Sequence, residues 1–103
     1  MSSVVPFPMR DRRAAAPLWR EVAGKELRDE RKARGERISD VAERAGVSGQ
    51  YLSEIERGVK DPSSEILSSV AGALGLSLLD LTERASRRLQ ASSSRGGALC
   101  LAA

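Results

Sequence analysis

The stretch that decides the fold is residues 38–57, which read ISDVAERAGVSGQYLSEIER. Apolar residues recur every three or four positions between Ile38 and Ala45, and this spacing predicts a short helix with one buried face. Gly46 is expected to end that helix, because glycine readily adopts the left-handed conformation that a tight turn requires. Ser48 then stands where a serine side chain can cap the start of a second short helix.

The two short helices are expected to cross closely, which requires a small residue at the crossing, and Ala42 meets that requirement. Val47, Leu52 and Ile55 then fall under the crossing and fix its angle. This arrangement is a helix-turn-helix, which presents its second helix as a rigid rod to the major groove of DNA. We therefore expect the helix at about residues 48–57 to be the recognition helix.

Helical spacing continues on both sides of this motif. It predicts further helices over residues 18–34, 63–74 and 77–89, and the alternation of apolar and polar residues that is typical of strands does not occur. The sequence therefore predicts an all-α domain of five helices at residues 18–90, with a fifth helix that takes part in dimerisation.

The two ends of the chain differ in composition from this domain. Residues 1–17 contain prolines, serines and three arginines without an apolar period, and we expect a flexible basic arm. Residues 91–103 are rich in serine, glycine and alanine, and we expect a disordered tail.

Composition excludes several kinds of chemistry. The 103 residues contain no histidine, which excludes histidine-based catalytic triads and histidine-ligated metal sites. The single cysteine excludes an internal disulfide and fits a reducing, cytoplasmic environment. No apolar run approaches the roughly 20 residues of a membrane span. We expect no catalytic residues, no metal and no cofactor, and the net charge of +3 allows nucleic-acid binding without requiring it.

Residues 42–58 (AERAGVSGQYLSEIERG) and 62–75 (PSSEILSSVAGALG) resemble the Cro/cI-type, or XRE-like, helix-turn-helix domain. The similarity covers roughly residues 24–82. Within this family, the same segments are most similar to the clp-gene regulators of actinobacteria. The resemblance implies a five-helix, lambda-repressor-like DNA-binding domain of a transcription regulator. Ile38 stands where the family often has a glutamine that contacts DNA, so that contact is not carried over.

The exposed start of the recognition helix offers the candidate base contacts: Ser48, Gly49, Gln50, Tyr51, Ser53 and Glu54. Gln50 can pair with adenine through two hydrogen bonds, and Glu54 can accept a hydrogen bond from the amino group of cytosine. The basic residues around that helix are the candidate phosphate contacts: Arg34, Arg37, Arg57 and Lys60. Plain solvation of a polar surface is the alternative for each of these residues.

Two further sets of residues have a structural role in this interpretation. The resemblance implies a partly buried ion pair between Arg31 and Glu56, which would tie the first helix to the recognition helix, and an exposed pair of little weight is the alternative. Trp19, Val22 and Leu79 are the candidates for a dimer surface. Packing of Trp19 within its own domain is the alternative there.

The resemblance also implies partners. Acidic residues near Asp40 and Glu43 contact RNA polymerase in cI-like activators, and clp-gene regulators activate protease and chaperone genes. The terminal Leu101, Ala102 and Ala103 look like a tag that directs polypeptides to Clp-type proteases, and an ordinary frayed terminus is the alternative.

These observations together predict a cytoplasmic, dimeric transcription regulator. It would bind an inverted repeat in double-stranded DNA, without a membrane partner, and it would act as an activator of clp genes. The alternative is an antitoxin-like or repressor helix-turn-helix protein that controls its own operon.

Overall fold

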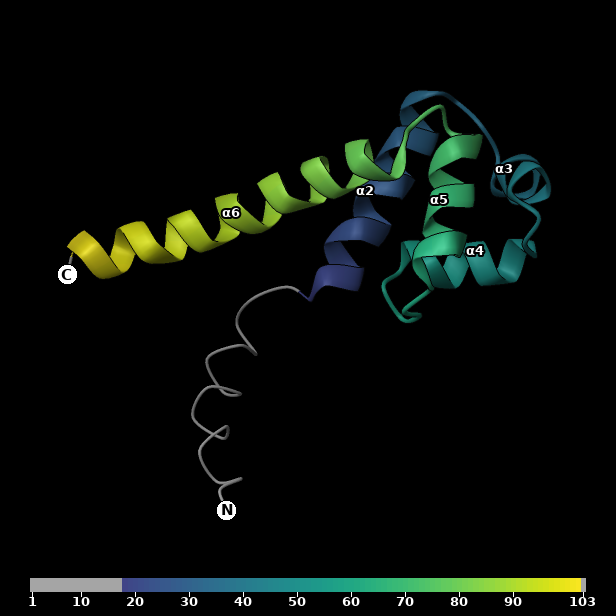
Figure 1. Cartoon of the computed structure of the whole chain (residues 1–103). Coiled ribbons are helices and arrows are strands. Elements are labelled where there is room, and N and C mark those ends of the chain that lie inside the picture. The colour runs from purple at the N-terminus through teal and green to yellow at the C-terminus, as the bar shows by residue number, and fades with distance from the viewer. Residues whose placement is uncertain (1–17, 103) are drawn as a thin grey trace, which may run out of the picture.

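The computed structural model describes residues 18–102, with side-chain environments over residues 18–92. The described residues form five helices: α2 (Trp19–Ala33), α3 (Ile38–Ala45), α4 (Gly49–Glu56), α5 (Ser64–Ala73) and α6 (Leu78–Ala102) (Figure 1). This part of the chain contains no strand, so the predicted all-α fold of five helices is confirmed. The predicted basic arm at residues 1–17 lies outside the described residues.

Local signals set the turn between α3 and α4 and the start of α5. Gly46 has a φ of +77°, the left-handed conformation that the sequence predicted for this turn. Ser48 is the N-cap of α4, where its Oγ accepts a hydrogen bond from the backbone N–H of Tyr51 at 3.0 Å. Ser63 caps α5 in the same way, through the N–H of Ile66 at 3.2 Å. These caps satisfy N–H groups that would otherwise lack a partner at the helix starts.

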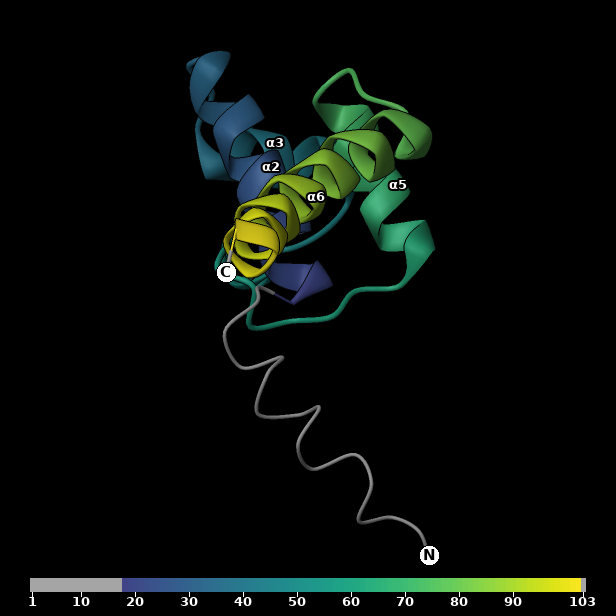
Figure 2. The ribbon, with the colours of Figure 1, turned by 90° about the vertical axis from the view of Figure 1, so that its left-hand side faces the viewer.

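The core between the helices is aliphatic. Its largest fully buried side chains are Leu27, Val41, Leu52, Ile55, Val70, Leu74 and Leu81. Figure 1 shows α3, α4 and α5 gathered at one end of the molecule, while α6 crosses α2 and runs away from them. Figure 2 looks along α6 and shows α2 and α5 on either side of it. The helix-turn-helix is therefore supported from behind by α2 and α5.

The backbones of α2 and α4 come close together at Gly24. A Cβ atom at this position would lie only 2.1 Å from the backbone oxygen of Ile55, so any side chain here would force the two backbones to shift. Near its start, α2 is also linked to the turn after α4 by Arg20, whose Nε donates to the backbone oxygen of Gly58 at 2.9 Å. Glycine lowers helix propensity, so its place inside α2 is explained by this contact between helices.

Arg31 and Glu56 form a buried ion pair between α2 and α4, as the family resemblance implied. The Nε and Nη2 of Arg31 donate to the two carboxylate oxygens of Glu56 at 2.7 and 2.9 Å, and its Nη1 donates to the backbone oxygen of Glu36 at 3.0 Å. The two side chains are only 12% and 4% exposed. The hydrogen-bonded carboxylate of Glu56 raises the pKa of Arg31 above its ordinary value.

A second set of ion pairs joins α2 to α6. Nη1 of Arg84 lies 2.7 Å from Oε1 of Glu30, and Arg88 contacts both Glu26 and Asp29. The Arg84 guanidinium lowers the pKa of Glu30 below its ordinary value of 4.5. Stability from the Glu30 carboxylate is therefore present above that value and is lost as the pH falls through the lower, folded pKa.

The helix α6 is longer than the sequence predicted. It was expected to end near residue 89, before a disordered tail at residues 91–103, but the helix continues to Ala102. Residues 91–102 contain no proline to break the helix, and the alanines and leucines after the two glycines favour it. Leu101 and Ala102 fall at the end of α6, Ala103 lies outside the described residues, and a degradation signal at this end stays a prediction.

Within residues 18–102, no single helix is both long and apolar enough to cross a membrane. Taken together, α5 and the first part of α6 have the length and composition of a membrane span, but the two helices are bent by 98° relative to each other.

We predict that Gly24→Ala lowers the free energy of unfolding by about 1–3 kcal/mol, because the added methyl group forces α2 and α4 apart. Urea denaturation would measure the change. Gly72→Ala is the matched control, because Gly72 is exposed in α5 and a Cβ there meets no atom within 4 Å. The control should gain up to about 1 kcal/mol from helix propensity. Equal stability of the two variants would contradict a crossing fixed by Gly24.

We also predict that Glu56→Gln lowers the free energy of unfolding by about 3 kcal/mol, because Arg31 then keeps a buried charge without a counter-charge. Glu83→Gln is the matched control, since Glu83 is exposed on α6 and forms no ion pair with the described residues. Denaturation of the control should match wild type. Similar losses in both variants would mean that the Arg31–Glu56 pair contributes no more than a surface charge.

Candidate nucleic-acid interface

The helix α4 has one face in the core and one face toward solvent. Leu52, Ile55 and Glu56 are buried beneath it. The predicted base contacts occupy the remaining surface, two exposed and four half-buried: Ser48 and Gln50, then Gly49, Tyr51, Ser53 and Glu54. The recognition helix is thus held firmly from one side, which leaves a mainly polar surface available on the other.

The apolar neighbours of α4 change the role of two positions. Tyr51 packs partly against the hydrophobic core, so its ring contributes to folding as well as to the surface. Ile38 also packs against the core, and its Cγ2 lies 3.7 Å from where a Cβ of Gly49 would be. The start of α4 therefore rests on an apolar side chain and receives no polar support from Ile38.

Three polar side chains interact along the exposed face of α4. The Nε2 of Gln50 donates to Oε2 of Glu54 at 3.5 Å, and the Nζ of Lys60 lies 4.0 Å from Oε1 of Glu54. These contacts are long, and they place an amide and a cation on either side of the Glu54 carboxylate. The carboxylate is therefore partly offset by Lys60 where it would otherwise repel DNA.

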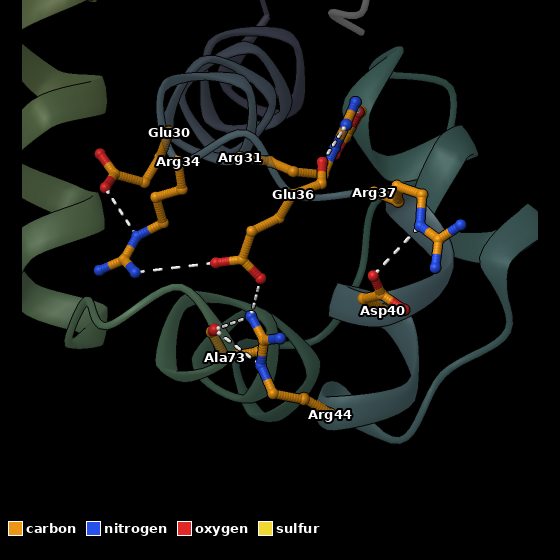
Figure 3. Close-up of polar contacts among 9 residues, drawn as sticks. Glu30, Arg31, Arg34, Glu36, Arg37, Asp40, Arg44 and Ala73 are labelled. Atoms are coloured by element: carbon orange, nitrogen blue, oxygen red, sulfur yellow. Dashed lines mark hydrogen bonds and ion pairs between the residues drawn. The ribbon is translucent and has the colours of Figure 1, made fainter.

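The basic residues that the sequence grouped as phosphate contacts lie in two places. Arg37 is 80% exposed at the start of α3, and Arg57 is exposed just after α4. Arg34 instead points toward α6, as Figure 3 shows, and its Nε lies 3.1 Å from Oε2 of Glu30. Its guanidinium also lies where a Cβ of Gly75 would be. Arg34 therefore takes part in the contact between α2 and the turn before α6, and a phosphate contact by this residue stays a prediction.

A network that the sequence did not predict supports α3 (Figure 3). The Nη2 of Arg44 donates to the backbone oxygen of Ala73 at 2.7 Å and also binds the carboxylate of Glu36. Glu36 extends the network to Arg34, 3.7 Å away. Arg44 and Ala73 are 29 residues apart, and a backbone acceptor carries no signature in the sequence, so no local pattern could reveal the contact.

The remaining predicted residues are scattered over the surface. Asp40 forms an ion pair with Arg37 at 3.3 Å, whereas Glu43 is exposed on α3. Trp19 and Leu79 are 36% and 64% exposed, but Val22 is only 7% exposed. The prediction of Val22 as a dimer contact is corrected, because this residue packs inside its own chain.

Trp19 and Leu79 do not form one patch. The ion pairs between α2 and α6 link Arg84 to Glu30 and Arg88 to Glu26, so the two helices run in opposite directions past each other. Trp19 starts α2 and Leu79 lies near the start of α6, which places them at opposite ends of this helix pair.

Comparisons with known proteins agree with this geometry. A family model described as helix-turn-helix matches residues 27–81. The transcriptional regulator ClgR of Mycobacterium tuberculosis is 48% identical over 77 residues, which cover 71% of this chain and 69% of that protein. The regulator DdrOP3 of Deinococcus deserti is 46% identical over 57 residues, covering 55% of this chain and 44% of that protein.

A solved structure gives the same result for the fold. The crystal structure of the clp gene regulator ClgR from Corynebacterium glutamicum superposes with a TM-score of 0.73 at 39% identity, over 82% of this chain and 90% of that one. The similarity extends well beyond the two helices of the motif. The chain therefore belongs to the Cro/cI-type (XRE-like) helix-turn-helix family of DNA-binding transcriptional regulators, with the ClgR proteins among its relatives.

Proposed function

We propose that this chain is a ClgR-like regulator that binds an inverted repeat in double-stranded DNA as a homodimer and activates genes of Clp proteolysis. The proposed DNA contact is supported by the two different faces of α4. One face is buried and fixes the helix in the fold, and the other is polar and bears Gln50 and Glu54. The target genes follow from the relatives named as clp gene regulators. Such a protein acts in the cytoplasm, where the chromosomal DNA of a bacterium lies.

A dimer is proposed because α4 is short. Its eight residues span about 12 Å, enough to read only a few base pairs in the major groove. Two copies related by a two-fold axis would read half-sites roughly 34 Å apart. The helix α6 supports this proposal, because it extends beyond the rest of the helical body in Figure 1 and offers length for contact with a second copy.

We predict that Gln50→Ala weakens binding to DNA upstream of a clp gene by about 5- to 150-fold, because a side chain that pairs with a base edge contributes about 1–3 kcal/mol. Fluorescence anisotropy at fixed salt would measure the dissociation constant. Ser69→Ala is the matched control, since Ser69 is an exposed polar residue on α5, and its variant should bind as wild type does. Footprinting of the wild type should show two protected half-sites.

The outcome that would reject the proposed function is the absence of any sequence-specific complex for wild-type protein at low salt. Binding by wild type, with equal affinity of the Gln50→Ala and Ser69→Ala variants, would keep DNA binding but remove Gln50 from the base contacts. Analytical ultracentrifugation of the same samples tests the dimer.

We predict that Glu43→Gln lowers transcription from a clp promoter in a purified system while leaving DNA affinity unchanged, because the exposed carboxylate on α3 is free to contact polymerase. Asp40 is less available, since it pairs with Arg37. Glu65→Gln, which changes an exposed carboxylate on α5, is the control and should transcribe normally. Normal transcript levels with Glu43→Gln at saturating regulator would rule out this contact.

A further inference from the structure

A hollow of about 220 Å³ lies between α2 and α4, beside the surface proposed to face DNA. Its lining comes from both helices, from the residue after α4 and from the start of α3: Arg28, Arg31, Ile38, Ser53, Glu56 and Arg57. Three of these six side chains are guanidinium groups. The charges around the hollow decide what it can hold.

The buried pair accounts for one positive and one negative charge in this hollow. Arg31 donates to both carboxylate oxygens of Glu56 and to a backbone oxygen, so it is neutralised and well supplied with acceptors. Arg28 and Arg57 are exposed, and neither forms an ion pair with any residue of the described chain. The hollow therefore keeps two positive charges without compensation.

The acidic residues close to the hollow in sequence are engaged elsewhere. Asp29 and Glu30, which follow Arg28 in α2, bind Arg88 and Arg84 on α6. Glu54, which follows Ser53 in α4, interacts with Gln50 and Lys60. These contacts draw the neighbouring carboxylates away, so the two free arginines can attract an anion from outside the chain.

We propose that Arg28, Ser53 and Arg57 together hold one phosphate of the DNA backbone. A guanidinium presents paired N–H donors that match the oxygens of a phosphate, and a serine hydroxyl can donate a further hydrogen bond. Ser53 is then assigned to the backbone and not to a base, because it lines the same hollow as the two arginines. This inference rests on the proposed DNA binding, and it adds Arg28 of α2, which sequence reasoning did not single out.

The phosphate contact would fix the position of α4 in the groove. Arg28 belongs to α2 and Arg57 follows α4, so one bound phosphate would bridge the two helices whose crossing is set at Gly24. Contacts to phosphates orient a protein on the duplex, whereas contacts to base edges carry the sequence information. Loss of the bridge should therefore weaken binding to every DNA sequence by a similar factor.

The test uses Arg28→Gln in the full chain, with Arg87→Gln as the matched control. Arg87 is an exposed arginine on α6 that forms no ion pair with the described residues and does not line this hollow. We expect Arg28→Gln to weaken DNA binding by about tenfold and to reduce the slope of log K against log salt by about one per subunit. Arg87→Gln should bind as wild type does. Circular dichroism melts of both variants would verify that they fold.

A scan of single methylphosphonate substitutions along the DNA locates the contact. Wild type should lose affinity at one phosphate in each half-site, and Arg28→Gln should be insensitive to neutralisation of that phosphate. Arg57→Gln should lose sensitivity at the same phosphate, which keeps the test valid if Arg28→Gln folds poorly. Full sensitivity of both variants there would overturn the proposal.

Further measurements distinguish a phosphate of DNA from free phosphate as the bound anion. They also distinguish failure of the phosphate site from failure of the proposed function. Calorimetric titration of the free protein with inorganic phosphate should show only weak binding. Tight phosphate binding that is lost in Arg28→Gln, with DNA affinity unchanged, would overturn the DNA assignment in favour of a free anion. If wild type binds DNA and Arg28→Gln binds equally well, only the phosphate site fails. If wild type binds no DNA, the proposed function fails as well.

Discussion

The architecture depends on how closely α2 approaches α4. At Gly24 the backbones come so near that even a methyl group would collide with the carbonyl of Ile55. This closeness allows Arg31 to reach Glu56 with two hydrogen bonds and places Arg28 beside Ser53. A wider crossing would leave a buried carboxylate unpaired and would open the hollow between the helices. The glycine thus sets a distance on which both stability and the proposed surface depend.

Some charged side chains of the protein form ion pairs within the fold, and others remain available for contacts with a partner. Carboxylates on α2 are bound by arginines of α6, and Glu36 is bound by Arg44 across the loop before α3. Two arginines without an ion pair among the described residues, Arg28 and Arg57, line the hollow between α2 and α4. A chain with a net charge of only +3 can therefore present a local positive surface at this hollow, because the nearby carboxylates of α2 are bound by arginines of α6.

Local sequence signals predicted the helices and the motif turn well, because Gly46 and Ser48 act within a few residues of their own positions. Contacts between distant segments were harder to predict. From the sequence alone, Gly24 only lowers the helix propensity of α2, and its purpose appears when its contact with the backbone of Ile55 is known. Arg44 donates to the backbone oxygen of Ala73, and no residue type in the sequence marks such an acceptor. Adjacency in sequence to Arg37 does not show on which side of the loop Arg34 lies, so its ion pairs with Glu30 and Glu36 could not be predicted. The sequence predicts too short an α6, because serine and glycine lower helix propensity, whereas the absence of proline lets the helix continue to Ala102.

The length of α6 makes it a lever. The last ion pairs that the described residues place between α6 and α2 are those of Arg88, and the helix continues to Ala102, which is roughly 20 Å further along its axis. A tilt of about 10° at the attachment would move the far end by about 3–4 Å, close to the rise of one base pair. If two copies associate through α6, the angle between α6 and α2 sets the register of the two recognition helices along the duplex. That angle is held by the ion pairs of the α6 arginines with α2. Small angular changes far from the DNA would then act as changes in the preferred spacer length.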